Sequence, residues 1–484
     1  MTEAWKNITV KELMAPVNGT LISGSPETAL AGVSTDTRAI KQGEAFVALR
    51  GENFDGHNFI TTAALKGAAC IVVDDEKKVP EGIDAAVVRV KDCLTALGDF
   101  ACFWRHQHKA KVVSITGSMG KTTTKEMTSC ILEIENETLK NEGNLNNLIG
   151  LPLTLFKLNN RHKRAVLEMG MNHFNEIRRL TRISDPDIGL ITNVGPVHLE
   201  GVNDINGVAR AKTEMIEEMR PGSRAILFGD DNILMKEASR FNREFFTFGQ
   251  GPENEVTAEG IEALKSGGMK YRLRYRDESI PVELQVSGMH NLINSLAAAS
   301  VAICMNESFK SIADGLNRFK GIKGRLITDV LPDDILLLDD TYNSNPSSLK
   351  AALEVANEKA GAERRIIVGL GEMLELGDET VRAHIQAGRL VAEKGAEFLF
   401  AMGAHAEYML RGAVEAGFPS EKAIEIKSHH DMIDHINDVM KKGDLVLLKG
   451  SRMMGLEKVV QGLRGKRQKE EQNNGKTKGN NIGR

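Results

Sequence analysis

The chain is poor in cysteine, and its few cysteines do not form the pattern of a disulfide framework or a zinc site. There are five, an odd number, scattered from Cys70 to Cys304 and never in a CxxC pair. Disulfide scaffolds and zinc knuckles need even numbers or close spacings. The scattered thiols therefore predict a reduced protein of the cytoplasm.

The chain also has few aromatic residues, no excess of basic residues and no long apolar run. Aromatics make up 5% of the chain, the formal net charge is -4, and no stretch approaches the ~18 apolar residues of a membrane span. Nucleic-acid surfaces combine basic charge with rings that stack on bases. The first twenty residues lack the apolar segment of a signal peptide. We therefore expect no nucleic-acid partner, no membrane insertion and no export.

Apolar residues in short blocks are abundant. At 484 residues and 41% hydrophobic, the chain is too long for one ordinary core, so we predict an α/β protein of three domains. Residues 1–108 mix short apolar runs with turns, as a small α/β domain does. Residues 109–322 and 323–463 alternate strands with helix-length segments, which predicts two units with mostly parallel sheets, the second Rossmann-like. Residues 464–484 have almost no apolar content and predict a disordered tail.

The strongest chemical signal follows a predicted strand at residues 111–116. The turn GSMGK separates this strand from the helix-like segment TTTKEMTSCILEI. Strand, glycine turn and helix N-terminus together cradle phosphate, with a lysine on its oxygens and a threonine on Mg²⁺. Ile115 stands where the GxxxxGK[ST] motif has its first glycine, so an ordinary glycine turn is the alternative. The predicted ATP-binding residues here are Gly117, Ser118, Met119, Gly120, Lys121, Thr122 and Thr123.

The variant T-G-S-x-G-K-T resembles the phosphate loop of the Mur ligase family, and other segments resemble the family to about residue 460. The turn NLNN, the strand end LEMGM and the segment ITNVGPVHLE fall where that family has functional residues. The resemblance implies substrate binding by Asn144, Asn146 and Asn147, and catalytic and Mg²⁺-binding roles for Glu168 and His198. A polar loop and an ordinary loop histidine are the alternatives.

Lys212 lies on the apolar face of the helix predicted for DINGVARAKTEMIEEM. A lysine there can snorkel, with its stem on apolar surface and its ammonium in water. The family resemblance implies instead that CO₂ carbamylates Lys212, whose new carboxylate then helps Thr122, Glu168 and His198 to hold Mg²⁺. Lys121, Glu168, His198 and Lys212 are thus the expected catalytic residues.

Residues on both sides of the second domain boundary resemble further parts of the family's ATP site. Asn291 and Asn294 lie in GMHNLINSLAAAS, which resembles the family's helix under the nucleotide and implies ATP binding by Asn294. Capping of a helix by these asparagines is the alternative. Arg325 resembles a hinge arginine that reaches phosphate when the domains close. The segment LLLDDTYNSNPSSLKAAL, alternatively an acidic strand end and a polar turn, implies nucleotide contacts from Asp340, Tyr342 and Asn343.

Segments near both ends of the chain resemble substrate-binding elements of the family. STDTR and RGENFDGHNF resemble its UDP-sugar elements, and a guanidinium there suits diphosphate oxygens. LLKGSRMMGLE resembles a C-terminal element. Local backbone capping by short polar residues is the alternative. The expected substrate-binding residues are Ser34, Thr35, Asp36, Arg38, Asp55, His57, Ser451 and Arg452.

Three C-terminal segments, DDTYNSNP, GLGEMLELGDETVRAHI and LLKGSRMMGLE, resemble the family member that joins D-alanyl-D-alanine to UDP-N-acetylmuramoyl-tripeptide. The resemblance implies an ATP- and Mg²⁺-dependent amide ligase of peptidoglycan synthesis that works through an acyl phosphate, as a monomer with small-molecule partners only. Phosphoryl transfer needs positioning and charge neutralisation, so no protein nucleophile is expected. The alternatives are another Mur-type ligase, amino acid adding or folate polyglutamating, and a non-catalytic nucleotide-gated scaffold.

Overall fold

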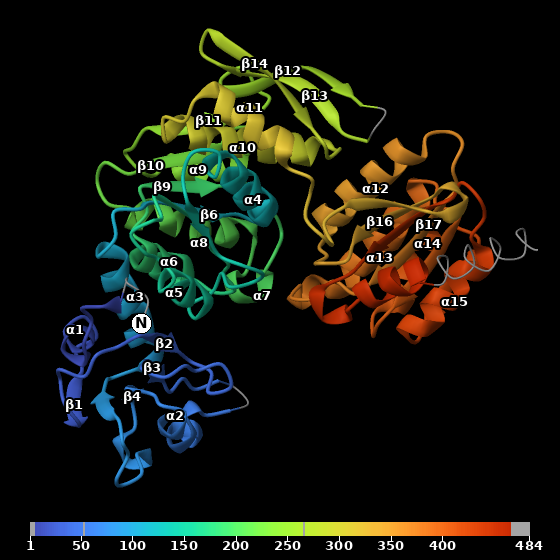
Figure 1. The fold of residues 1–484 in the computed structure, drawn as a ribbon. Helices are drawn as coiled ribbons and strands as arrows, with labels where there is room; N and C mark the ends of the chain where they lie inside the picture. The colour runs from blue at the N-terminus through green and yellow to red at the C-terminus, as the bar shows by residue number, and fades with distance from the viewer. Residues whose placement is uncertain (1–4, 52–53, 265–266, 466–484) are drawn as a thin grey trace, which may run out of the picture.

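The computed structural model describes residues 5–51, 54–264 and 267–465. Three α/β units follow one another along the chain, each around its own sheet (Figure 1). This arrangement confirms the predicted fold class. The predicted boundaries after residues 108 and 322 stay predictions, and the predicted tail lies outside the described residues except for its first two positions.

The first unit contains a five-stranded sheet in the order β1-β5-β4-β3-β2. Only β1 runs antiparallel to its neighbour. The short apolar run Cys70–Val73 forms the fully buried strand β4. The strands are β1 (Thr20–Ser23), β2 (Gly32–Ser34), β3 (Glu44–Val47), β4 (Cys70–Val73) and β5 (Ala86–Arg89), and the helices are α1 (Val10–Met14), α2 (Ile60–Leu65) and α3 (Cys93–His106).

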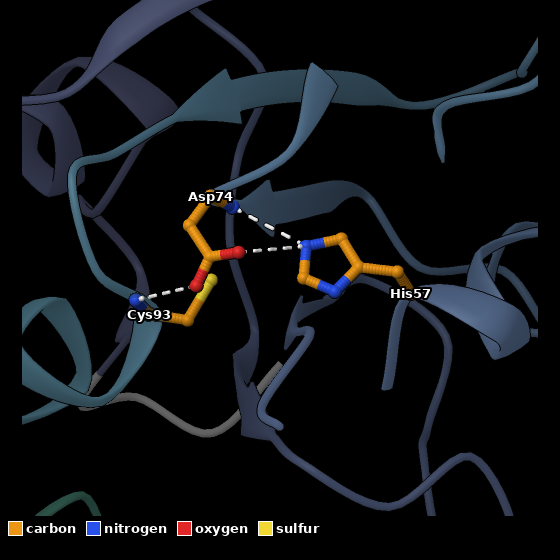
Figure 2. Close-up of side chains that lie close together, drawn as sticks. All are labelled: His57, Asp74 and Cys93. Carbon is orange, nitrogen blue, oxygen red and sulfur yellow. Dashed lines mark hydrogen bonds and ion pairs between the residues drawn. The ribbon is translucent and has the colours of Figure 1, made fainter. Parts of the chain in front are cut away.

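A buried polar cluster holds the loops of this unit together (Figure 2). The His57 ring lies between two carboxylates, with Nδ1 2.7 Å from Asp55 Oδ1 and Nε2 3.3 Å from Asp74 Oδ1. Asp74 also accepts from the Cys93 backbone N–H and pairs with Arg50 at 2.8 Å. His57, Asp74 and Cys93 are close enough to share a metal ion. Since Arg50 already neutralises Asp74, we interpret the cluster as structural.

The central unit contains a nine-stranded sheet in the order β14-β13-β12-β11-β10-β9-β6-β8-β7. The strands from β7 to β12 are parallel, as predicted, but β13 and β14 add an antiparallel edge that the sequence reasoning did not anticipate. The strands are β6 (Lys111–Thr116), β7 (Thr138–Lys140), β8 (Arg164–Glu168), β9 (Ile188–Ile191), β10 (Arg224–Phe228), β11 (Phe245–Phe248), β12 (Val256–Ala263), β13 (Met269–Tyr275) and β14 (Glu278–Leu284).

Helices cover this sheet, and two of them were predicted from the sequence. The segment after the phosphate loop forms α4, and the segment around Lys212 forms α8. The helices of the central unit are α4 (Lys121–Leu132), α5 (Gly150–Leu155), α6 (Glu176–Ser184), α7 (Leu199–Val202), α8 (Ile205–Glu218), α9 (Asn232–Ala238), α10 (Met289–Cys304) and α11 (Phe309–Arg318).

The C-terminal unit contains a six-stranded sheet in the order β15-β16-β20-β17-β18-β19, with only β15 antiparallel. Strands alternate with helices along residues 323–463, as predicted. The elements are β15 (Ile327–Leu331), β16 (Ile335–Asp340), β17 (Ile366–Gly371), β18 (Phe398–Met402), β19 (Ala423–Ile426), β20 (Leu445–Lys449), α12 (Pro346–Ala360), α13 (Thr380–Glu393), α14 (Ala406–Glu415) and α15 (His429–Val439).

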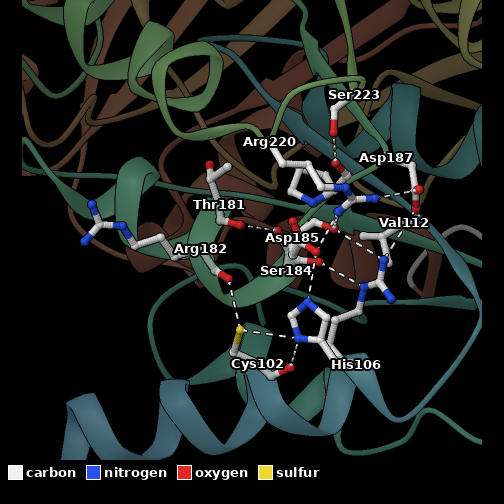
Figure 3. A network of polar contacts seen from close by, with 12 residues as sticks. Cys102, His106, Val112, Thr181, Arg182, Ser184, Asp185, Asp187, Arg220 and Ser223 are labelled. Atoms are coloured by element: carbon white, nitrogen blue, oxygen red, sulfur yellow. Dashed lines mark hydrogen bonds and ion pairs between the residues drawn. The ribbon is translucent and has the colours of Figure 1, made fainter.

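The first and central units share one apolar core, which crosses their joint at α3. Trp5 and Trp104 stack with ring centroids 4.0 Å apart, and Phe156, after α5, lies 6.0 Å from Trp5. Beside the rings, a polar network links α3 to the end of α6 and the loop after it (Figure 3). In it, His106 Nε2 lies 3.0 Å from Asp185 and the Cys102 thiol donates to the Arg182 carbonyl. The joint is therefore part of a continuous buried core.

The C-terminal unit has apolar clusters of its own, composed of residues from Leu326 onward. In Figure 1 it stands beside the central unit, to which a single connector joins it. Within the described residues, no helix is both long and apolar enough to cross a membrane.

Candidate active site

A cleft of about 1280 Å³ opens between the central and C-terminal units. Its walls include the phosphate loop, the NLNN turn, and the loops that follow β8, β9, β16, β17 and β20. These loops follow the carboxyl ends of parallel strands, which is where open α/β sheets bind ligands. The cleft therefore joins residues that the sequence places in two different domains.

The phosphate loop is shaped by two glycines with positive φ. Gly117 has φ +148° and Gly120 has φ +78°, which glycine adopts without strain. A Cβ on Gly120 would lie 2.2 Å from Asn294 Oδ1, so α10 packs directly on the loop. Because α4 begins at Lys121, its free N–H groups face the cleft and suit an anion such as phosphate.

The remaining loop residues are held by the segment after β9. Ser118 Oγ donates to the Gly195 carbonyl at 3.0 Å, and the Met119 N–H donates to Asn193 Oδ1 at 2.9 Å. Lys121 Nζ bonds to the Gly117 carbonyl at 2.7 Å. Burial lowers the pKa of Lys121, against the opposing effect of the Glu168 charge. Thr122 and Thr123 are buried, and both line the cleft.

Glu168 ends β8 with a buried carboxylate that faces the cleft. Its Oε1 accepts from Asn146 Nδ2 at 3.0 Å, whereas its Oε2 has no hydrogen-bond partner among the described residues. The Thr122 hydroxyl lines the same cleft. An orphan carboxylate oxygen and a hydroxyl are hard oxygen ligands, so this donor set fits Mg²⁺.

Asn141 positions Glu168, and sequence reasoning missed it. Its side chain brackets the glutamate backbone, because Nδ2 donates to the Glu168 carbonyl at 3.0 Å and Oδ1 accepts from the Glu168 N–H at 2.9 Å. Lys125 Nζ donates to the Asn141 carbonyl at 2.7 Å. The only signal in the sequence was the place of Asn141 just before the NLNN turn.

The three asparagines of the NLNN turn all line the cleft. Asn146 contacts Glu168, as described. Asn147 caps α5, because its Oδ1 accepts from the Gly150 N–H at 2.8 Å. The Asn144 carbonyl accepts from the Asn146 N–H at 2.8 Å. Local capping therefore accounts for Asn147, and the substrate-binding roles of the three stay predictions.

His198 lies at the C-terminal edge of β9 and contacts the opposite wall. Its Nδ1 is 2.8 Å from Glu375 Oε2, a carboxylate of the C-terminal unit. The residue has φ +54°, in the left-handed region that few non-glycine residues adopt. Glu375 was not predicted as a site residue, although it lies in the segment GLGEMLELGDETVRAHI. The His198–Glu375 pair bridges the cleft.

Lys212 lies on α8 with its side chain buried beneath the cleft wall. Within the described residues its ammonium makes no hydrogen bond or ion pair, and it is not among the residues that line the cleft. Burial holds the pKa of Lys212 well below its usual value, and the charge of Lys121 lowers it further. Because its side chain is almost fully buried, snorkelling does not describe it. The neutral amine is the form that reacts with CO₂.

Arg325 spans the two units. Its guanidinium lies 4.3 Å from the centroid of the Tyr342 ring and donates to Thr122 Oγ1 at 3.0 Å. Arg452 approaches the same ring at 5.6 Å. A tyrosine between two guanidinium groups is a favourable cation–π arrangement. Tyr342 lines the cleft beside these two cations, and its place beside the nucleotide stays a prediction.

Asp340 and Lys449 form a buried ion pair at the ends of β16 and β20. Lys449 Nζ lies 2.5 Å from Asp340 Oδ2 and donates to the Asn343 carbonyl at 2.9 Å. Burial lowers the pKa of Lys449, while the charge of Asp340 acts in the opposite direction. The pair therefore fixes the turn that carries Tyr342 and Asn343.

Replacing Lys449 by methionine should lower the free energy of unfolding of the C-terminal unit by about 3–5 kcal/mol, because it leaves the buried Asp340 carboxylate unpaired. Denaturant unfolding with a C-terminal-unit fluorescence probe would measure the loss. The double variant Asp340→Leu, Lys449→Met should recover most of it. A single variant as stable as the parent would contradict the prediction.

The two asparagines of α10 differ in their contacts. Asn294 Oδ1 accepts from Thr124 Oγ1 at 3.3 Å and touches the phosphate loop. Asn291 Nδ2 donates to the Ser287 carbonyl at 2.8 Å, and neither asparagine caps the start of α10. Both line the cleft, together with Ser451 and Arg452 after β20.

The predicted residues of the first unit do not line the cleft. Arg38 is exposed and pairs with Asp36 at 2.7 Å, and this hydrogen-bonded pair lowers the pKa of Asp36 to about 2. Ser34 Oγ donates to the Asp36 carbonyl at 3.1 Å. His57 is fully engaged with its neighbours (Figure 2). Ser34, Thr35, Asp36, Arg38, Asp55 and His57 therefore lie apart from the cleft, and their substrate-binding roles stay predictions.

Three segments of the chain match known Mur ligase domains. Residues 29–105 match the Mur ligase family, catalytic domain; residues 115–302 match the Mur ligase middle domain; and residues 318–452 match the Mur ligase, glutamate ligase domain. These matches cover most of the chain and follow the order of its three sheets.

Full-length relatives give the same result. The UDP-N-acetylmuramoyl-tripeptide--D-alanyl-D-alanine ligases of Escherichia coli and Bacillus subtilis are 35% and 32% identical, each over 94% of this chain and 98% of theirs. MurF from Acinetobacter baumannii superposes with a TM-score of 0.85 at 32% identity, over 94% of this chain and 98% of that one. MurF from Thermotoga maritima, in complex with ADP, superposes with a TM-score of 0.80 at 26% identity, over 91% of this chain and 98% of that one. The chain belongs to the Mur ligase family.

Proposed function

We propose that this protein is an ATP-dependent ligase that joins D-alanyl-D-alanine to UDP-N-acetylmuramoyl-tripeptide, releasing ADP and phosphate. The observation that carries the proposal is the cleft, in which the phosphate loop faces the turn of Tyr342 and Asn343 from the C-terminal unit. The named function of the full-length relatives and the ADP complex of one of them support the substrate assignment. The product is the pentapeptide precursor of peptidoglycan.

The chemistry has two steps. The tripeptide carboxylate attacks the γ-phosphorus of ATP, which forms an acyl phosphate and releases ADP. The dipeptide amine then attacks the acyl carbon; the C–N bond forms, phosphate leaves with the electrons of the C–O bond, and the nitrogen loses a proton. Lys121 and Arg325 neutralise the negative charge that both steps gather in the cleft.

Mg²⁺ is part of this proposal. The Thr122 hydroxyl and the free Glu168 oxygen would hold it, with a carbamylated Lys212 as a further carboxylate ligand. His198 offers a nitrogen, which Mg²⁺ prefers less, so it would act through water. When bound, the ion neutralises phosphate charge and keeps the reacting atoms in line. The residues of the chain orient the carboxylate and phosphates around it.

The remaining parts of the proposal concern the substrate and the state of the protein. Ser34, Thr35, Asp36 and Arg38 would bind the UDP end of the elongated substrate, whose peptide end reaches the cleft. All five cysteines are free, which supports a cytoplasmic location, and the protein is proposed to act as a monomer. No nucleic-acid partner is proposed.

Phosphate release with ATP, Mg²⁺, UDP-N-acetylmuramoyl-tripeptide and D-alanyl-D-alanine, each omitted in turn, tests the function. We expect release only when all four are present, with the pentapeptide product identified by its mass. Turnover with a single amino acid or with a folate in place of these substrates would retain the family and overturn the substrate assignment. ATP binding without turnover under all conditions would favour a scaffold.

A further inference from the structure

Among the carboxylates of the cleft, Glu375 is set apart by its partners. Glu176, Asp230 and Asp231 accept hydrogen bonds from backbone N–H groups. Asp340 pairs with Lys449, and the free oxygen of Glu168 is the proposed Mg²⁺ ligand. Among the described residues, Glu375 forms an ion pair with His198, and its side chain is 59% exposed. The carboxylates that line the cleft are Glu168, Glu176, Asp230, Asp231, Asp340 and Glu375.

The loop that carries Glu375 is held in place at its base. The Met373 N–H donates to His384 Nε2 at 3.1 Å, and the His384 ring is buried. The Leu374 N–H donates to Ser451 Oγ at 3.0 Å. Glu375 itself has φ +63°, a conformation that non-glycine residues keep only where the surroundings enforce it, often at functional sites. These contacts aim the carboxylate into the cleft.

Arg452 stands beside this loop. The hydrogen bond between Leu374 and Ser451 joins the two loops. Glu375 directly follows Leu374, and Arg452 directly follows Ser451. The Arg452 side chain is 62% exposed, and its ion pair with Glu457 is long, at 3.8 Å. A carboxylate and a guanidinium with unused hydrogen-bonding capacity therefore stand on adjacent loops of one cleft wall.

Exposed apolar side chains accompany the two charges. Leu374 precedes Glu375 and Met453 follows Arg452; their exposed fractions are 38% and 84%. Both line the cleft. The wall thus offers one anionic group, one cationic group and apolar surface, which is complementary to a short zwitterionic peptide with small apolar side chains.

We propose that Glu375 and Arg452 bind the two charged ends of the acceptor dipeptide: Glu375 receives its ammonium group and Arg452 its carboxylate. Leu374 and Met453 cover its methyl groups. The inference rests on the proposed function. Because Glu375 touches His198, at the end of the strand next to β6 and its phosphate loop, the amine is held beside the site where the acyl phosphate forms.

Steady-state kinetics of Glu375→Gln and Arg452→Gln test the assignment. Each should raise the KM for D-alanyl-D-alanine about ten- to a hundredfold, the usual range for losing one charged hydrogen bond. The KM values for ATP and for UDP-N-acetylmuramoyl-tripeptide should stay within about twofold, inside the context dependence of such measurements. Glu375→Asp should restore part of the loss. Glu379→Gln, an exposed glutamate of the same segment, is the matched control and should behave as the parent.

A dipeptide that ends in an amide separates binding from structural damage. It lacks the carboxylate, so the parent should bind it poorly, and Arg452→Gln should bind it no worse than the parent does. Equal losses for the acid and the amide would overturn the role of Arg452. A fall in kcat with an unchanged dipeptide KM would overturn that of Glu375, which would then act through His198. Failure of the parent to form the pentapeptide would instead reject the proposed function.

Discussion

Replacing Lys212 by alanine should lower kcat about a thousandfold, the size expected when a preorganised charge at the reaction centre is removed. The structure gives the reason: the amine is buried, it has no partner among the described residues, and burial holds its pKa well below the usual value, which favours the neutral form that reacts with CO₂. Carbamylation converts the amine and CO₂ into a carbamate and a proton. The measurement is kcat with all substrates saturating.

Small carboxylic acids provide the decisive control for Lys212. Acetate or formate can enter the space left by Lys212→Ala and supply a carboxylate, so they should restore part of the activity. They should leave Lys236→Ala, an exposed lysine on α9, unchanged. The parent should also take up label from isotope-labelled bicarbonate at Lys212. Full activity of Lys212→Ala without added acid would reject carbamylation as a catalytic requirement.

Replacing Glu168 by glutamine should also lower kcat about a thousandfold, because metal-assisted charge neutralisation contributes several kcal/mol to such reactions. The substitution keeps the size of the side chain and the contact with Asn146, so only the charge of the free oxygen is lost. The concentration of Mg²⁺ needed for half-maximal activity should rise as well. A titration of activity against Mg²⁺ measures both effects.

A surface glutamate controls for the general effect of losing one negative charge. Glu137→Gln, exposed at the far side of the central unit, should retain the parent kcat and the parent Mg²⁺ requirement. Thermal unfolding should show that Glu168→Gln remains folded. If Glu168→Gln kept both the activity and the Mg²⁺ dependence of the parent, Glu168 would have no place in the metal site.

The elements around the phosphate loop were predictable because local sequence determines them. A buried apolar strand, two glycines and a helix that opens with Lys121 form one continuous stretch, and the structure forms β6 and α4 from it. The strands of the C-terminal unit were predictable for the same reason. Their apolar blocks are buried on both faces of a mostly parallel sheet.

Other parts of the site depend on contacts between distant segments. Glu375 is placed in the site by its contact with His198, and Asn141 by its hydrogen bonds to the Glu168 backbone. The local sequence around Glu375 or Asn141 does not predict these distant partners. Likewise, the alternation of buried and exposed residues along β13 and β14 can be read from the local sequence. Their antiparallel addition to a parallel sheet depends on the whole unit. Lys212 was identifiable as unusual from helix periodicity, whereas its lack of a partner required the fold.

The shared core at α3 has a consequence for how the protein is made. Trp5 and Trp104 leave the ribosome early, but the core that buries them includes residues as late as Ala238. Until those residues are synthesised, the first unit carries an apolar face with nothing to cover it, and such faces promote aggregation during folding. The C-terminal unit, whose apolar clusters begin at Leu326, has no such dependence. In the order of synthesis, the chain is therefore one long folding unit followed by one short one.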